Sequence, residues 1–187
     1  VSCSAVTGSQ FTEVAGLTGA TSLTVGDELH SDRWCALVSG GGVSCWSPTG
    51  GNVATSVAGV SGAIGLSMGT TQSCVVLVDG TVSCWGRGRA AATPVVGLSG
   101  AVQVAIGGGR TQIESDRICA RLATGTISCW EDSGTDGIQG GQPVHTAPTT
   151  WPGVTDAVQV EMNGFGTCVR TSSGAISCWE GRSSSSP

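Results

Sequence analysis

The sequence predicts an all-β protein, a β-propeller-like array of four four-stranded blades plus an orphan N-terminal strand. Three observations carry this prediction: a cysteine pair that recurs four times, an alternating apolar segment before each pair, and a glycine at a fixed place inside it. Successive first cysteines are 39, 45 and 49 residues apart, and a period of about 40 to 50 residues is typical of propellers and solenoids. No segment has convincing helical periodicity.

Each alternating segment reads as a half-buried strand, because its apolar residues fall on one face and its small or polar residues on the other. These segments span residues 20–25, 63–68, 101–106 and 157–162. A short segment that ends in glycine and an aliphatic residue precedes each of them. Together with the two strands of a cysteine hairpin, four strands fit each repeat. The expected repeats are about 4–46, 47–85, 86–130 and 131–179, in a domain of 1–179 followed by a Ser-rich tail or linker at 180–187.

The cysteine pairs specify their own turn. Nine residues separate the members of each pair, and tryptophan follows each second cysteine. The pairs are Cys35 and Cys45, Cys74 and Cys84, Cys119 and Cys129, and Cys168 and Cys178. Glycine recurs six positions after each first cysteine, at Gly41, Gly80, Gly125 and Gly174.

A three-residue loop, a type I turn that ends in a left-handed glycine, sets the two cysteines of such a hairpin opposite each other. They then lie within disulfide reach, so we expect four disulfides. The alternative is eight free buried cysteines. Zinc is less favoured, because structural four-cysteine sites use C-x2-4-C spacing, and we expect no metal site.

Composition excludes several classes of protein. Only 11% of the 187 residues are charged, the net charge is -5, and all eight basic residues are arginine. Such an acidic chain lacks the basic surface that binds phosphates, so we expect no nucleic-acid partner. Residues 34–78 carry no charge, but Gly, Ser, Thr and Pro interrupt them. Since a spanning helix needs about 20 mostly apolar residues in a row, we expect no membrane span.

At this point the repeated motif C-[AV]-x-x-x-x-G-x-[VI]-S-C-W, with A-V-Q-V-type strands between its copies, resembles the regulator of chromosome condensation repeat family. The closer resemblance is to a bacterial extracellular branch in which each blade carries a cysteine pair. The resemblance implies a β-propeller, typically seven-bladed, that acts as a binding platform and not as an enzyme. The family's stretch after C-W-G is degenerate here, since only Trp85-Gly86 keeps the glycine.

The N-terminus starts in the middle of a repeat. Val1-Ser2-Cys3 matches Val43-Ser44-Cys45, the second strand of a hairpin. The chain is then a fragment of a longer array, a four-bladed ring with a spare strand, or an array whose incomplete edge is completed by another copy. Cys3 has no partner within the pattern, and in an oxidising compartment this indicates intermolecular pairing or a reactive thiol.

No residue pattern indicates catalysis, so we expect no enzyme activity and no cofactor. Gly65 to Gly69 match the nucleophile elbow G-x-S-x-G, but Ser67 occupies a strand position without the strand-to-helix turn that this motif needs. His30 and His145 lie in non-equivalent loops. The acidic loop at residues 27–32 is interpreted as solvated charge and not as a Ca²⁺ site.

Two further features suggest ligands or modification. Trp151, beside Pro152, is the best single candidate for an exposed stacking residue, although packing is the favoured interpretation. Ser/Thr/Pro-rich composition is typical of O-glycosylated stalks, with unmodified loops as the alternative. The candidate O-glycan residues are Thr146, Thr149, Thr150, Ser183, Ser184, Ser185 and Ser186.

The sequence therefore predicts a non-catalytic, secreted structural protein, a subunit of an extracellular fibre or cell-surface assembly. Long uncharged β structure lacks the Lys and Glu that keep sheet edges apart, which favours self-association through the N-terminal half-blade. Nine cysteines indicate an extracellular or cell-surface location. The alternative function is a soluble extracellular binding module, a lectin-like or protein-inhibitor propeller.

Overall fold

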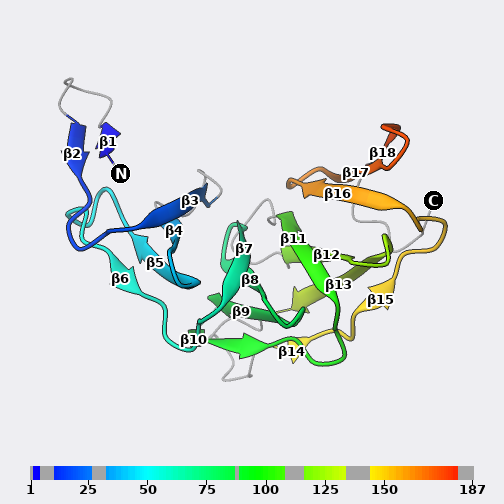
Figure 1. Cartoon of the computed structure of the whole chain (residues 1–187), viewed down its shortest axis with the longest axis horizontal. Helices are drawn as coiled ribbons and strands as arrows, with labels where there is room; N and C mark the ends of the chain where they lie inside the picture. Colours follow the sequence, from blue (N-terminus) through cyan, green and yellow to red (C-terminus); the bar gives the residue numbers. More distant parts are fainter. Residues whose placement is uncertain are drawn as a thin grey trace.

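The computed structural model describes residues 2–4, 11–26, 33–86, 89–107, 116–133 and 144–180, and these form antiparallel sheets arranged as blades along an arc (Figure 1). This arrangement confirms the predicted all-β, propeller-like fold. The first strand of each blade lies on the concave side of the arc, and the later strands follow outward in chain order (Figure 1). The arc begins at the two-stranded sheet near the N-terminus and ends at the blade nearest the C-terminus.

The strands are as follows. A two-stranded sheet holds β1 (Ser2–Ser4) and β2 (Phe11–Glu13). The first blade holds β3 (Ala20–Val25), β4 (Trp34–Val38), β5 (Gly42–Trp46) and β6 (Thr55–Ser56). The second blade holds β7 (Ala63–Met68), β8 (Gln72–Leu77), β9 (Val82–Gly86) and β10 (Arg89–Pro94). The third blade holds β11 (Ala101–Gly107), β12 (Asp116–Leu122), β13 (Ile127–Ser133) and the short β14 (Val144–His145) and β15 (Thr149–Thr150). The fourth blade holds β16 (Ala157–Met162), β17 (Gly166–Thr171) and β18 (Ile176–Glu180).

The cysteine hairpins adopt the expected turn. In the second blade Leu77 N donates a hydrogen bond to Thr81 O at 2.9 Å across a three-residue loop, and Gly80 has a φ of 78°. The paired cysteines lie opposite each other in all four hairpins and are joined as disulfides, with Cα atoms 4.0 or 4.1 Å apart. The Thr81 hydroxyl and backbone N–H both donate to Asp79 Oδ1, which lowers the pKa of that carboxyl below its usual value.

The blades are offset from the sequence repeats. The short segment that opens each repeat pairs with the hairpin of the repeat before it, as β6 with β5, β10 with β9, and β15 with β13. Each repeat therefore begins with the strand that completes the preceding blade. The N-terminal β1 is not alone, because it pairs with β2 in the same way.

Most of the core lies between blades, and a further cluster around Trp46 joins the first blade to the segment that precedes it. Each of three buried clusters combines disulfide sulfurs of one blade with the first strand and the tryptophan of the next. Trp85, Trp130 and Trp179 each follow the second cysteine of their own hairpin. They pack against the disulfide of the preceding blade. Because burying apolar surface is the main favourable term in folding, each blade depends on its neighbours for stability.

We predict that the four disulfides differ in their resistance to reduction. Cys84 is fully buried by the third blade, whereas Cys178 is exposed, and a thiolate must reach the disulfide sulfur in order to attack it. Under limiting dithiothreitol the Cys168–Cys178 bond should open first and the Cys74–Cys84 bond late. Alkylation with heavy and light reagents, read by peptide mass spectrometry, gives the order, and simultaneous opening of both bonds would contradict the prediction.

Each disulfide closes a loop of the same size, with a sequence separation of 10. We expect the removal of one buried disulfide to lower the free energy of unfolding by roughly 2–3 kcal/mol. The Cys74→Ser/Cys84→Ser variant, unfolded in urea, measures this cost.

Candidate functional site

Successive blades are joined by a backbone contact at the hairpin turn. The turn glycine of one blade accepts a hydrogen bond from the first residue of the next inner strand. These bonds run from Ala63 N to Gly41 O, from Ala101 N to Gly80 O and from Ala157 N to Gly125 O, at 2.9, 2.9 and 2.8 Å. A Cβ added at these three glycines would come within 2.6, 2.9 and 2.6 Å of the backbone of the next blade. Glycine is therefore required both for its positive φ and for close approach.

A side-chain clamp adds to the contact between the third and fourth blades. Gln103 Nε2 donates to Val160 O at 2.8 Å, and Val160 N donates to Gln103 Oε1 at 3.1 Å. Arg121 Nε lies 3.5 Å from the same Oε1 atom. The amide of Gln103 thus pairs with a backbone N–H and C=O of the next inner strand as another strand would.

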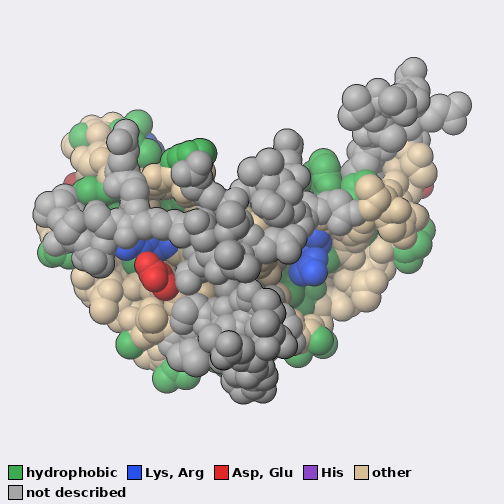
Figure 2. Space-filling view, turned by 180° about the vertical axis from the view of Figure 1, so that it is seen from behind, with side chains coloured by type: hydrophobic (Ala, Val, Ile, Leu, Met, Phe, Trp, Pro, Cys, Tyr) green, Lys and Arg blue, Asp and Glu red, His purple; other side chains and the backbone are tan. Residues whose placement is uncertain are grey.

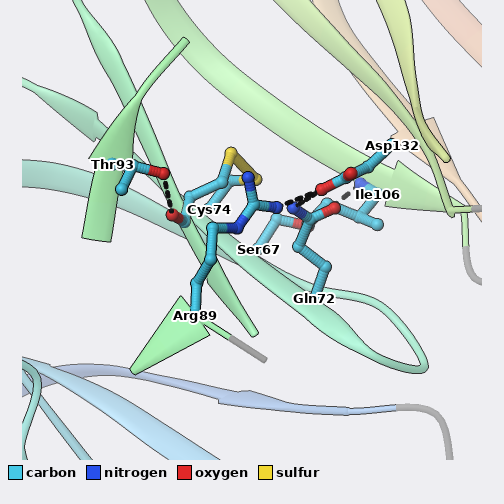
Figure 3. Close-up of a disulfide and its surroundings, with 8 residues drawn as sticks. Ser67, Gln72, Cys74, Arg89, Thr93, Ile106 and Asp132 are labelled. Carbon is cyan, nitrogen blue, oxygen red and sulfur yellow. Dashed lines mark hydrogen bonds and ion pairs between the residues drawn. A yellow bond between two sulfur atoms is a disulfide. The ribbon is translucent and has the colours of Figure 1, made fainter. Parts of the chain in front are cut away.

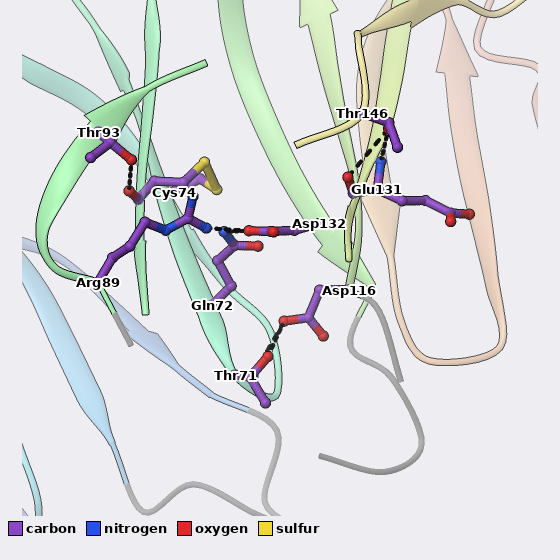
Figure 4. Close-up of polar contacts among 10 residues, drawn as sticks. Thr71, Gln72, Cys74, Arg89, Thr93, Asp116, Glu131, Asp132 and Thr146 are labelled. Carbon is purple, nitrogen blue, oxygen red and sulfur yellow. Dashed lines mark hydrogen bonds and ion pairs between the residues drawn. A yellow bond between two sulfur atoms is a disulfide. The ribbon is translucent and has the colours of Figure 1, made fainter. Parts of the chain in front are cut away.

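The contact between the second and third blades contains buried charge (Figures 3 and 4). Asp132 Oδ2 accepts hydrogen bonds from Arg89 Nη2 and Gln72 Nε2, and the Asp132 side chain is fully buried. Next to it across β12 and β13, Asp116 Oδ2 accepts hydrogen bonds from Thr71 Oγ1 at 2.8 Å and Thr71 N at 3.3 Å. Two carboxylates of the third blade are thus held by groups of the second.

The inner strands carry aliphatic side chains into a groove along the concave side. In each blade the pairing shifts by one residue near the start of the inner strand, and such a bulge redirects the extra side chain. The residues at the shift are Thr21, Ile64, Val102 and Val158, and all four are exposed. A groove of 530 Å³ is lined by all four inner strands, with Ile64 and Val102 among its apolar residues and Gln103 and Glu161 among its polar ones.

The outer face of the fourth blade is open. Ile176 is 67% exposed, whereas the equivalent Val43, Val82 and Ile127 are 2%, 0% and 0% exposed under the next blade. Beside it, Phe165, Met162 and the Cys168–Cys178 disulfide line a hollow of 330 Å³. Within the described part of the chain, this face leaves exposed an aliphatic side chain whose equivalents are buried in the other three blades.

The structure places Trp151 in packing contact. Its ring is half-buried and lies 4.6 Å from the ring of Trp179, with the Arg117 guanidinium 5.8 Å from its centroid. This agrees with the favoured packing interpretation, and a stacking role toward a ligand stays a prediction.

The candidate O-glycan residues of the third blade belong to its outer edge. Thr146 Oγ1 accepts from Glu131 N and donates to Glu131 O, at 2.9 and 3.2 Å (Figure 4). Thr149 Oγ1 donates to Cys129 O at 3.3 Å, and Thr150 is exposed. Ser183, Ser184, Ser185 and Ser186 lie outside the described residues, and glycosylation stays a prediction.

Ser67 lies inside β7, and its Oγ accepts a hydrogen bond of 3.1 Å from Ile106 N in the third blade (Figure 3). The hydroxyl thus belongs to a blade contact. His30 and the acidic loop fall outside the described residues. Within the described ranges no group of three or more His, Cys, Asp or Glu side chains is placed to hold a metal, and no helix there is long and apolar enough to cross a membrane.

Sequence reasoning missed the buried charges of Arg89, Asp116 and Asp132. Asp116 has a counterpart in Asp32, three residues before the first cysteine of its hairpin, but no repeated spacing links Arg89 to Asp132. The repeat pattern gave no means of pairing them.

We predict that Arg89→Gln lowers the free energy of unfolding by about 3–5 kcal/mol, because it removes the guanidinium that pairs with the buried carboxylate of Asp132. Arg33→Gln, at an exposed arginine, is the matched control and should change stability by about 0.5 kcal/mol or less. Adding Asp132→Asn to Arg89→Gln should recover part of the loss. Urea unfolding measures all three, and equal stability of the two single variants would contradict the prediction.

No family model matches the chain, and no curated protein does. Among solved structures, human WBSCR16 is similar with a TM-score of 0.69 at 14% identity, over 91% of this chain and 50% of that one. Prp20p from Saccharomyces cerevisiae, a yeast RCC1, is similar with a TM-score of 0.59 at 16% identity, over 80% and 41%. The ectodomain of the Physcomitrella patens receptor kinase CR4 is similar with a TM-score of 0.53 at 22% identity, over 86% and 40%. The chain spans half or less of the length of these proteins, and the likeness shows an RCC1-like β-propeller fold.

Proposed function

We propose that the protein is a non-catalytic structural module that assembles with further copies of itself outside the cell. The exposed Ile176 on the open face of the fourth blade carries this proposal. Fully burying such a side chain is worth roughly 1.5–3 kcal/mol. Contiguous exposed apolar surface is a mark of interaction sites on soluble proteins, and Ile176 adjoins the hollow lined by Met162 and Phe165.

The opposite end of the arc supports the proposal. Leu23 and Val25 of the first inner strand are each 46% exposed, whereas the equivalent Val104 and Ile106 of the third blade are 6% and 5% exposed. The two ends of the arc thus expose the two different faces that blades use to pack on each other. A contact between unlike faces is head-to-tail and gives a closed ring or an open filament.

The cysteines support a location outside the cytosol. Four disulfides are stable in an oxidising compartment and rare in a reducing one. A secreted or cell-surface protein of the bacterial extracellular branch fits this chemistry. Figure 2 also shows few charged side chains on the described part of one face, and a low-charge surface does little to oppose association.

We expect the purified chain to associate as its concentration rises. Ile176→Glu places a charge on the open face and should shift the protein to monomer, while Val96→Glu, at a valine that is 85% exposed elsewhere, should leave association unchanged. Sedimentation velocity measures the species, and electron micrographs distinguish rings from filaments. Circular dichroism checks that both variants fold. A wild-type protein that stays monomeric at high concentration would refute self-assembly.

The groove on the concave side favours a second candidate function, a binding module for an extended segment of a partner protein that carries both polar and apolar side chains. Ile64 and Val102, the bulged residues of two neighbouring inner strands, line it together with polar residues such as Ser67 and Glu161. Prp20p, which has the same fold, was studied for its binding to Gsp1p and histones.

For this second candidate, peptides selected on the wild-type chain from a random display library should lose binding to Val102→Asp. Their binding to Ile176→Glu should persist, because Ile176 lies outside the groove. Selected peptides that respond to Ile176→Glu alone would place binding at the blade end and count against the groove.

A further inference from the structure

We infer that the fourth blade of one copy docks on the first blade of a second copy by the contacts that join neighbouring blades within one chain. In this junction β18 takes the place of β1 as the partner of β2. The inference rests on the proposed self-assembly and specifies its partner and geometry. Four features of the two end blades support it, and each matches a contact between neighbouring blades within the chain.

The first contact is the turn glycine. Gly174 keeps the positive φ of its counterparts, at 86°. An added Cβ there would meet none of the described residues within 4 Å, whereas at Gly125 it would meet the next blade at 2.6 Å. The residue that would donate to Gly174 O is Ala20 of the second copy. Ala20 is exposed, while the equivalent Ala63, Ala101 and Ala157 are buried.

The second contact is the side-chain clamp. The fourth blade repeats the pair of the third, with Gln159 in place of Gln103 and Arg170 in place of Arg121. Arg170 Nε donates to Gln159 Oε1 at 3.1 Å, and Gln159 Nε2 donates to Glu161 Oε1 at 3.1 Å. Gln103 uses the same arrangement to hold the backbone of Val160 in the next blade. By position, Gln159 would hold the backbone of Leu23 in a second copy.

The third contact is apolar. The outer half of the fourth blade presents Ile176 and the exposed Cys178, and the first blade presents Leu23 and Val25. Within the chain, the equivalents of these two sets form one cluster at each blade contact. The docked copies would therefore bury the same kinds of side chain against each other.

The fourth contact is a strand pairing with a fixed register. In three blades the second cysteine lies opposite a threonine of the outer strand, as Cys45 opposite Thr55, Cys84 opposite Thr93 and Cys129 opposite Thr149. In β1 and β2, Cys3 lies opposite Thr12 in the same register. Beside β2, β1 therefore occupies the position that the third strand of a blade has beside its outer strand. Within the described residues, β18 pairs on one side with β17 and lacks this outer strand.

The junction differs from the internal contacts at Asn163. The equivalent Gly69 and Gly107 lie so close to the next blade that an added Cβ would come within 2.5 Å of Ile106 Cγ2 and Asn163 O, respectively. In the fourth blade the Asn163 side chain occupies this space, so the second copy must shift there. The junction should therefore be weaker than an internal contact and reversible.

The decisive experiment is a cross-link between two variants, both in a Cys3→Ser background. In the inferred register Glu13 of one copy lies opposite Ser177 of the other, as Ser56 lies opposite Ser44. Paired residues of this kind lie within the Cα distance of a disulfide. Within one copy β2 and β18 stand at opposite ends of the arc (Figure 1), so a disulfide reports two copies.

Mixing Glu13→Cys with Ser177→Cys under mild oxidation should give a covalent dimer, read by non-reducing electrophoresis and peptide mass spectrometry. Mixing Glu13→Cys with Ser61→Cys, at an exposed loop position, should give at least roughly tenfold less. If sedimentation shows assembly while the 13–177 bond is absent or no more abundant than the control, the junction is wrong and self-assembly stands. If no assembly forms, both the inferred junction and the proposed self-assembly are refuted.

A second arm tests the geometry at Asn163. Asn163→Gly removes the obstructing side chain and should lower the dissociation constant roughly tenfold, since overpacking of this kind is relieved. Asn163→Ala loses the same hydrogen bonds to Phe165 N and Gly166 N but keeps the Cβ, so it should give no such gain. Equal effects of the two variants would overturn the blade-like docking.

Discussion

The structure depends on how closely one blade backbone approaches the next. At Gly41, Gly80 and Gly125 no Cβ fits between the hairpin turn and the following inner strand. This approach sets the backbone hydrogen bond that joins the blades, and it brings the disulfide of one blade against the apolar strand of its neighbour. The disulfide in turn keeps the turn in the register that the contact needs. Small residues and cross-links thus replace the large core of an ordinary domain.

Charge has a concentrated structural use in the described part of the chain. Only 11% of the residues are charged, yet Arg89 and Asp132 are placed together between the second and third blades, with Asp116 beside them. A buried charge is tolerated when it is paired and hydrogen-bonded. The pair adds a charged contact between these two blades to the backbone hydrogen bond and apolar burial that every described blade contact has.

The fold could be predicted from sequence because its signals are local and repeated. Cysteine spacing and the turn glycine specify each hairpin, and alternation specifies each inner strand. The contacts between blades could not be predicted in the same way, since Gln72, Arg89 and Asp132 come from three separate strands and no spacing rule links them. The offset between repeat and blade was also missed, because pairing of a short strand such as Thr55–Ser56 with the previous hairpin depends on three-dimensional position and not on its own residues.

The offset has a consequence for how the chain is made. As the polypeptide emerges N-terminus first, the hairpin that ends at Trp46 is available before Thr55–Ser56, which must close its edge. The outer edge of each nascent hairpin therefore stays unpaired until the next segment has been synthesised. Unpaired strand edges are sites of aberrant pairing. Early oxidation of the hairpin would hold the two waiting strands in register during this interval. The same bonds that stabilise the finished protein would thus protect it during biogenesis.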